Sequence, residues 1–252
     1  MVATALPGIR RVEHVMGMPI VIDLRDVDTD GAMLGRAFDE FRSIDARFST
    51  YKEESEISRL NRGEIASSEV HADVQEVLSR CAVLREATQG YFDVHAASRS
   101  VLDPSGLVKG WSVDRVAGIL WGLGARNFAI NAGGDVIVRG RGHPDDCWRV
   151  GIQHPVLSHK VAAVVVANDL AIATSGAYAR GDHVIDPHTR RPPAGVLSVT
   201  ITGPDLATAD AYATAAFAMG TRGPAWTAKL AGYEAMTILA DERVLSTPGF
   251  PK

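Results

Sequence analysis

The sequence predicts an α+β fold in which helices pack on mixed, largely antiparallel sheets. Amphipathic segments with apolar residues at helical spacing occupy residues 32–48 and 73–89. Short alternating segments gather after residue 127, and a Gly-Gly-Asp turn between two of them is typical of a hairpin. No GxGxxG fingerprint stands in a suitable context, which argues against a dinucleotide-binding parallel sheet.

Length and composition narrow the class of protein. No repeat, low-complexity tract or linker divides the 252 residues, so residues 1–252 are expected to form a single domain. The net charge of -4 argues against nucleic-acid binding, which needs a basic face. No apolar run reaches the roughly 20 residues that cross a bilayer, and no apolar leader is found, so we expect a cytoplasmic location. An exported mature form is the alternative.

The N-terminal third predicts a strand followed by two helices. Residues 11–24 indicate a strand or hairpin arm that is interrupted at residues 16–19. The interruption is either a bulge or a close approach to a flat ligand, or it is an edge irregularity forced by Pro19, which is the favoured interpretation. The helix at 32–48 leads into a loop that ends at Tyr51. This loop is either a ligand contact or a plain polar loop, and a short helix capped by Ser55 follows.

The middle of the chain carries a segment with the composition of a ligand loop. The helix at 73–89 is expected to begin at Asp73 as N-cap and to stop at Gly90. Residues 102–111 then hold Asp, Pro, Ser, two Gly and Lys109, so we expect irregular backbone before a helix that begins near Ser112. Such a loop suits a diphosphate, but a simple βα loop with a surface lysine explains it equally well.

The second half predicts mostly strands. They are expected at 127–131, 136–139, 148–153, 160–167, 170–174, 197–202, 233–240 and 243–246, with a helix at 223–231. His183 stands beside a strand-like Val-Ile pair and an Asp-Pro turn that would hold it in place.

One helix, expected within residues 201–220, carries two polar residues on one face. Asp210 and Thr214 are four residues apart and project from the same side, one turn apart. A carboxylate and a hydroxyl among small residues offer the hard oxygen ligands that Mg²⁺ prefers. From this helix alone, a surface Asp and a Thr bonded to its own helix is the simpler interpretation.

Taken together, the motifs resemble those of one family, the ApbE-type flavin transferases (FAD:protein FMN transferases). The matching segments occur in the family's order and cover most of the chain. They are MGM at 16–18, RFSTYKEESEISRLN at 47–61, GYFD at 90–93, LDPSGLVKGWSVDR at 102–115, NAGGDVIVRG at 131–140, WRVGIQHP at 148–155, ATSGAY at 173–178, HVIDPHTRRPP at 183–193 and SVTITGPDLATADAYATAAFAMG at 198–220.

The resemblance implies a two-lobed fold with FAD between the lobes and Mg²⁺ on the diphosphate. A Thr or Ser hydroxyl of an acceptor flavoprotein attacks the phosphorus next to riboflavin, and AMP leaves. His183 would assist this step, with Asp210 as a second candidate base. The family's metal ligands match Asp210, Thr214 and the backbone oxygens of Gly106 and Ala213. Its flavin-nucleotide contacts match Met16, Tyr51, Tyr91, Phe92, Asp93, Asp103, Lys109 and Ile185.

Two departures from the family pattern bear on the site. Met18 stands where many members have Thr or Ser, and only nine residues separate Asp93 from Asp103. The alternatives to a transferase are an Mg²⁺-dependent FAD pyrophosphatase and a non-catalytic flavin-binding protein. The site interpretation requires that the Lys109 segment and the helix with Asp210 face each other in the folded chain.

Overall fold

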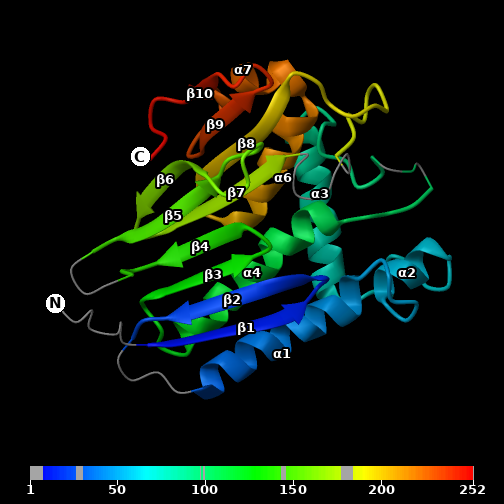
Figure 1. Cartoon of the computed structure of the whole chain (residues 1–252). Coiled ribbons are helices and arrows are strands. Elements are labelled where there is room, and N and C mark those ends of the chain that lie inside the picture. Colours follow the sequence, from blue (N-terminus) through cyan, green and yellow to red (C-terminus); the bar gives the residue numbers. More distant parts are fainter. Residues whose placement is uncertain are drawn as a thin grey trace.

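A computed structural model describes residues 8–26, 31–96, 98, 100–142, 146–176 and 184–251. Its centre is an eight-stranded sheet in the order β1-β2-β3-β4-β7-β8-β9-β10 with every neighbouring pair antiparallel (Figure 1). The strands are β1 (Ile9–Val15), β2 (Met18–Leu24), β3 (Phe128–Ala132), β4 (Asp135–Arg139), β7 (Leu170–Gly176), β8 (Val196–Gly203), β9 (Glu234–Leu239) and β10 (Val244–Ser246). The predicted combination of helices with antiparallel sheets is confirmed.

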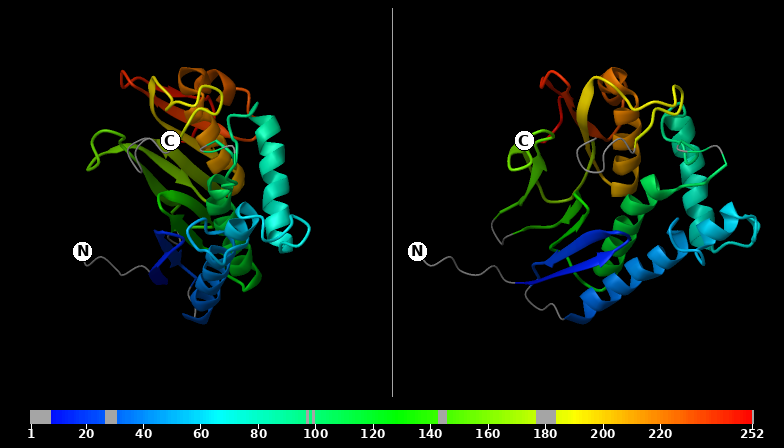
Figure 2. Two further views of the ribbon diagram at one scale, coloured as in Figure 1. Left: turned by 90° about the vertical axis from the view of Figure 1, so that its right-hand side faces the viewer. Right: turned by 45° about the vertical axis from the view of Figure 1, so that its right-hand side comes forward.

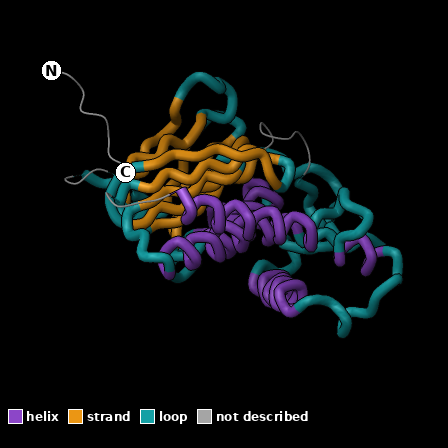
Figure 3. The backbone as a smooth tube through the Cα atoms, turned by 90° about the horizontal axis from the view of Figure 1, so that it is seen from below, coloured by secondary structure: helices purple, strands orange, loops and turns teal. Residues whose placement is uncertain are grey.

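Helices lie on one side of this sheet. They are α1 (Gly31–Phe48), α2 (Glu56–Asn61), α3 (Ala72–Ala87), α4 (Ser105–Gly122), α6 (Leu206–Ala218) and the short α7 (Gly223–Thr227). Figure 3 shows the strands as one layer and the helices as a second layer beside it. The main core lies between the two layers, where Ile22, Phe38 and Phe128 are fully buried. α3 stands farther out, separated from the sheet by α4 and α6 (Figure 2).

The opposite face of the sheet is partly covered by a hairpin. Strands β5 (Trp148–Gln153) and β6 (Val161–Ala167) pair with each other as a second, two-stranded sheet. Ile152 and Val165 of this hairpin pack with Ile172 of β7 and Ile238 of β9 in a separate apolar cluster. Successive side chains of β7 therefore point to opposite faces of the sheet and pack into two different apolar clusters.

The N-terminal strand prediction is corrected in one respect. Residues 16–19 are not an edge irregularity, because Met16 and Gly17 form the two-residue turn of a complete hairpin between β1 and β2. Both residues have positive φ values, 56° and 71°, as a type I′ turn requires. Pro19 sits inside β2 opposite His14 and does not break the strand.

The start of α4 differs more from expectation. The helix begins at Ser105, seven residues before the expected start near Ser112, so Gly106 and Lys109 are helical. Asp103 accepts a hydrogen bond from the Ser105 N–H at 3.0 Å and so stabilises the first turn. The predicted irregular backbone is therefore wrong between residues 105 and 111.

Smaller differences occur at other helix ends. Ser55 caps α2 as predicted, accepting the Ser58 N–H at 3.0 Å. The N-cap of α3 is His71, whose Nδ1 accepts the Asp73 N–H; Asp73 instead lies inside the first turn and pairs with Arg47 at 2.7 Å. The last predicted helix is shorter than expected, since α7 ends at Thr227. No helix in the described part of the chain is long and apolar enough to span a membrane.

Candidate active site

Three charged side chains from helices α4 and α6 and strand β4 meet between these helices and the sheet. Lys109 of α4 places its Nζ 3.3 Å from Oδ1 of Asp210 on α6 and forms a closer ion pair with Oδ2 of Asp135, the first residue of β4. Both carboxylates are almost completely buried, whereas the lysine side chain is 23% exposed. The proximity that the site interpretation requires, between the Lys109 segment and the helix carrying Asp210, is thus confirmed.

The close crossing of α4 and α6 explains how these groups come together. Gly110 lies against the start of α6, and a Cβ built there would stand 2.5 Å from the carbonyl oxygen of Leu206. Asp114, one turn further along α4, accepts the N–H groups of Leu206 and Ala207 at 2.9 and 2.8 Å. A glycine at the contact and a carboxylate on the helix terminus hold the two helices at a distance that side chains would otherwise prevent.

Charge in this cluster is only partly compensated. Burial raises the pKa of Asp210 to about 7, and Asp135 adds to the rise, while Lys109 opposes it. Burial also disfavours the charged form of Lys109, but the two carboxylates outweigh it and raise its pKa above the ordinary value. Oδ2 of Asp210 is buried and has no hydrogen-bond partner among the residues that the structure describes. A buried carboxylate oxygen without a partner is costly and fits a site for a cation.

Hydroxyl groups lie next to this carboxylate. Thr214, one turn after Asp210 on α6, has its Oγ1 3.3 Å from the Oγ of Ser175 on β7. One residue earlier on β7, the hydroxyl of Thr174 lies 2.9 Å from that of Thr200 on the neighbouring strand β8. The Thr174 N–H donates to Asp135 at 2.9 Å. Thr214 therefore faces the end of β7 and is not a surface residue bonded only to its own helix.

The composition of the cluster indicates which cation would fit. Within the described ranges, no group of three or more His, Cys, Asp or Glu side chains could hold a metal ion. A cation bound at Asp210 would therefore take neutral oxygens for its other ligands, as Mg²⁺ commonly does. Gly106 and Ala213 lie within helices α4 and α6, so only their backbone carbonyls are available, as the sequence interpretation assumed.

The GYFD segment joins two other predicted parts of the site. The ring of Phe92 packs on the first turn of α4, 3.2 Å from the position of a Cβ at Gly106. The ring of Tyr91 meets the His188 ring edge-on, with centroids 4.5 Å apart, in the loop that follows the Val-Ile pair. Both aromatic rings are buried. The segment thus connects the start of α4 with the loop that begins after Ile185.

The acidic residues beside this segment have structural partners. Asp93 accepts the His95 N–H at 2.9 Å and pairs with Arg85 at 3.2 Å. The backbone N–H of Asp103 donates to Val94, and its side chain holds the first turn of α4. Their predicted flavin contacts would have to form in addition to these bonds.

The remaining predicted site residues make fewer contacts with the Lys109 cluster and the GYFD segment, or lie outside the described residues. Met16 is partly buried in the β1–β2 turn, and Ile185 is half-buried after Val184. Tyr51 is 97% exposed, so its side chain lies almost entirely in solvent. His183, the predicted transfer residue, lies outside the described residues.

Asp135 is a site residue that the sequence interpretation missed. The Gly-Gly-Asp sequence predicts only a hairpin turn there, and this turn is confirmed at Gly133 and Gly134, whose φ values are positive. The available signal was the alternation of β4, which places Asp135 on the same face as the buried Ile137. An aspartate on the core face of a strand needs a buried partner, and Lys109 is that partner.

Comparison with known proteins places the chain in a family. The model of the ApbE family matches residues 16–100 and 94–237. The chain belongs to the ApbE family. A relative from Haemophilus influenzae named FAD:protein FMN transferase is 26% identical over 242 residues, covering 71% of this chain and 70% of that protein. A Vibrio cholerae protein of the same name is 36% identical over 129 residues, covering 47% of this chain and 39% of that protein.

The fold agrees with solved structures of the family. The crystal structure of the ApbE protein from Thermotoga maritima superimposes with a TM-score of 0.88 at 21% identity, covering 97% of this chain and 99% of that one. At this identity the likeness concerns the fold alone. The arrangement of one antiparallel sheet with a helical layer is therefore the family's arrangement.

Proposed function

We propose that this protein transfers FMN from FAD to a Thr or Ser hydroxyl of an acceptor flavoprotein and releases AMP. The observation that carries the proposal is the buried Asp210 carboxylate, with one oxygen unpartnered and Lys109 beside it, in a chain of the ApbE family. The relatives' name supports the reaction, and the cluster offers the charges that a diphosphate ester needs.

The chemistry is a substitution at phosphorus. The acceptor oxygen forms a bond to the phosphorus of the FMN half, the bond from that phosphorus to the bridging oxygen breaks, and AMP leaves with the electron pair. The hydroxyl proton must be removed, for which His183 is the proposed base. Lys109, which the two aspartates keep protonated, would neutralise charge that develops on the diphosphate oxygens.

The unpartnered oxygen of Asp210 fits a magnesium site. Asp210 and Thr214 would hold Mg²⁺ together with the carbonyl oxygens of Gly106 and Ala213, and the ion would supply charge neutralisation at the diphosphate. Asp135 already pairs with Lys109, so its proposed role is to keep the ammonium group in place. We assign no direct contact with the metal to Asp135.

The flavin nucleotide would contact the wall built by the GYFD segment. Tyr91, Phe92 and Asp93 are the proposed contacts there, with Asp103 and Lys109 on the α4 side. Met16, Tyr51 and Ile185 complete the proposed set. The single domain with two lobes around FAD, and the cytoplasmic location, remain predictions from the sequence.

One incubation separates the possible activities. The protein is mixed with FAD, Mg²⁺ and a Thr-containing acceptor domain, and the acceptor is analysed by intact mass spectrometry while AMP is measured by chromatography. An FMN-sized mass gain with equal AMP release is the expected result. AMP and free FMN without a mass gain would indicate a pyrophosphatase, and FAD binding without either product would indicate a flavin-binding protein.

His183 is tested in the same assay. We expect His183→Ala to retain FAD binding, measured by the change in flavin fluorescence, and to slow the transfer of FMN. A loss of FAD binding instead would make His183 a binding residue and leave the base unassigned.

A further inference from the structure

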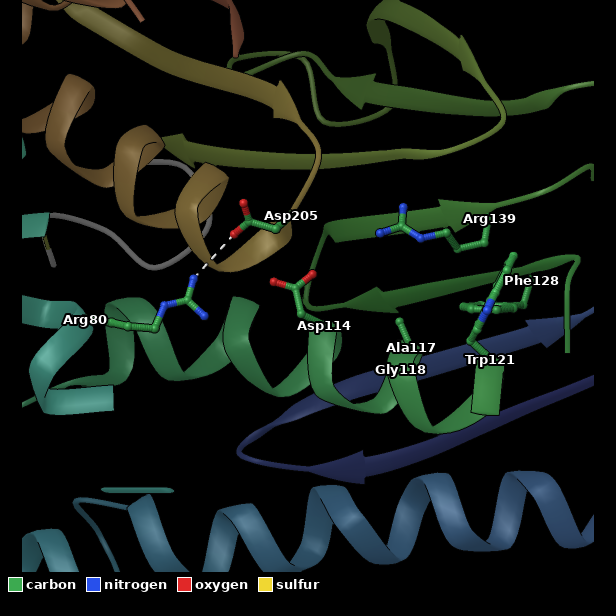
Figure 4. A pocket seen from close by; sticks show the side chains of 8 residues that line it. All are labelled: Arg80, Asp114, Ala117, Gly118, Trp121, Phe128, Arg139 and Asp205. Atoms are coloured by element: carbon green, nitrogen blue, oxygen red, sulfur yellow. Dashed lines mark hydrogen bonds and ion pairs between the residues drawn. The ribbon is translucent and has the colours of Figure 1, made fainter. Parts of the chain in front are cut away.

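A cavity at the other end of α4 has no part in the proposed reaction. It has a volume of about 390 Å³ and lies between the second half of α4, the β3–β4 hairpin and the start of α6 (Figure 4). Gly118, on its floor, follows Lys109 by nine residues, or about 13 Å along the helix axis. This distance separates the floor of the cavity from the Lys109 cluster, whereas Asp114 at the near edge follows Lys109 by five residues, or about 7.5 Å.

The helix terminus at the cavity is already occupied. The N–H groups of Leu206 and Ala207 donate to Asp114, and the Thr208 N–H donates to Asp205 at 2.8 Å. Asp205 also pairs with Arg80 at 3.5 Å. The N–H groups of Leu206, Ala207 and Thr208 at the start of α6 are therefore not free to bind an anion. The opposite charges of Arg80 and Asp205 neutralise each other.

Two charges that line the cavity remain without an ion-pair partner among the described residues. Arg139 donates only to the carbonyl oxygens of Val138 and Pro204, at 3.1 and 3.3 Å. Among the described residues, Asp114 accepts the two backbone N–H groups at the start of α6. Burial raises the pKa of Asp114 above the ordinary value, and these two bonds and Arg80 oppose the rise in part. Figure 4 shows Asp114 rising from α4 on one side of the cavity and Arg139 on β4 on the other.

The rest of the lining is apolar. Ala117 and Gly118 form the helix side, and Trp121 and Phe128 lie together at one end (Figure 4). Nothing stands within 4 Å of a Cβ built at Gly118, so this part of the cavity is open above the helix. The guanidinium of Arg126 lies 4.2 Å from the Trp121 ring centroid and braces this aromatic end.

We propose that this cavity binds a small zwitterion, a free α-amino acid with an apolar side chain. Its carboxylate would bind Arg139, its ammonium group would bind Asp114, and its side chain would lie against Trp121 and Phe128. An anion alone would lie beside Asp114, whose charge the start of α6 and Arg80 offset only in part. A cation alone would lie beside Arg139, whereas a zwitterion suits both charges. The mixture of apolar walls with a few convergent polar groups is typical of small-molecule sites.

The ligand class is tested by isothermal titration calorimetry with L-phenylalanine and two analogues that each lack one charge. These are 3-phenylpropionate, without the ammonium group, and phenethylamine, without the carboxylate. We expect saturable binding of L-phenylalanine or of L-leucine, and at least about tenfold weaker binding of both analogues. Two results would overturn the proposal. One is an affinity for either analogue equal to that for L-phenylalanine, and the other is that neither amino acid binds saturably up to about 10 mM.

Position is tested by a matched pair of variants at Gly118. Gly118→Leu extends a side chain into the cavity, whereas Gly118→Ala leaves most of its volume open and keeps the helix intact. Binding should fall at least about tenfold in Gly118→Leu and persist in Gly118→Ala. Arg139→Gln should lose binding to a similar extent, with circular dichroism as the check on folding. Unchanged affinity in Gly118→Leu and Arg139→Gln would place the ligand elsewhere.

Discussion

Two aspartates, the N-cap Asp205 of α6 and Asp210 within α6, differ in how their carboxylates are bonded, although they are five residues apart. Asp205 caps the helix, accepts the Thr208 N–H, and is bonded by Tyr233 and paired with Arg80. Burial opposes its ionisation, but these bonds outweigh the effect and hold the pKa of Asp205 below its ordinary value. Asp210 is more deeply buried and has one oxygen without a partner, and its pKa is raised to about 7.

The difference distinguishes a carboxylate with all its bonds made inside the chain from a carboxylate with one buried oxygen unpartnered among the described residues. Every polar requirement of Asp205 is met within the chain, so its bonds stabilise the folded state. Asp210 costs stability in the folded chain, and a cation would offset that cost. We therefore predict that Asp210 serves a ligand and does not stabilise the fold.

The largest expected effect follows removal of the unpartnered carboxylate. Asp210→Ala should lower FMN transfer by about 100-fold or more, the range seen when one electrostatic contact to a transition state is lost. The mass gain of the acceptor measures this loss. The thermal midpoint should not fall by more than a few degrees, because a buried, poorly compensated charge is removed. Full activity in this variant would contradict the site assignment.

The crossing of α4 and α6 provides the second test. Gly110→Ala would bring a Cβ against the Leu206 carbonyl and should lower the free energy of unfolding by about 1–3 kcal/mol, as overpacking does. Gly118→Ala on the same helix is the control, and should be neutral or stabilising by up to about 1 kcal/mol. Urea denaturation of both variants measures the difference. If Gly110→Ala were as stable as Gly118→Ala, a glycine would not be required where α4 and α6 cross.

Asp135 tests whether Lys109 must be held in place. Asp135→Asn removes one of the two negative charges beside the ammonium group, and we expect about tenfold slower transfer, or roughly 1.4 kcal/mol in the activation free energy. The Asn keeps an oxygen for the Thr174 N–H, so the strand pairing should persist. Unaltered kcat and KM for FAD would remove Asp135 from the site.

The smallest expected effect concerns Asp205. Asp205→Ala should lower the free energy of unfolding at pH 7 by about 1 kcal/mol through loss of the N-cap, with transfer activity close to that of the unchanged protein. Because the folded-state pKa is lowered, this stabilisation is present above the unfolded pKa and is lost as pH falls through the folded value. The difference from the unchanged protein should therefore shrink below about pH 4. A difference that grows in acid would contradict the assignment.

The site could be predicted in part. Asp210 and Thr214 stand out because helical spacing puts them on one face, and Lys109 stands out as a cation among small residues. Asp135 could not be paired with Lys109 from the sequence, since 26 residues separate them and only the sheet register brings β4 under α4. Burial of Asp210 likewise rules out a surface position for this residue, and its role as a metal ligand stays a prediction.

Local patterns in the sequence determined most elements of this protein. The periodicity of residues 32–48 and the alternation of residues 148–153 each depend on neighbours in the chain, and both elements form as expected. The tertiary structure alone decided where α4 begins. Gly106 and Gly110 disfavour a helix locally, but Gly106 packs on Phe92 and Gly110 on the backbone of α6. Packing of this kind outweighs a propensity cost of about 1 kcal/mol per glycine, and it places the lysine on a rigid helix facing Asp210.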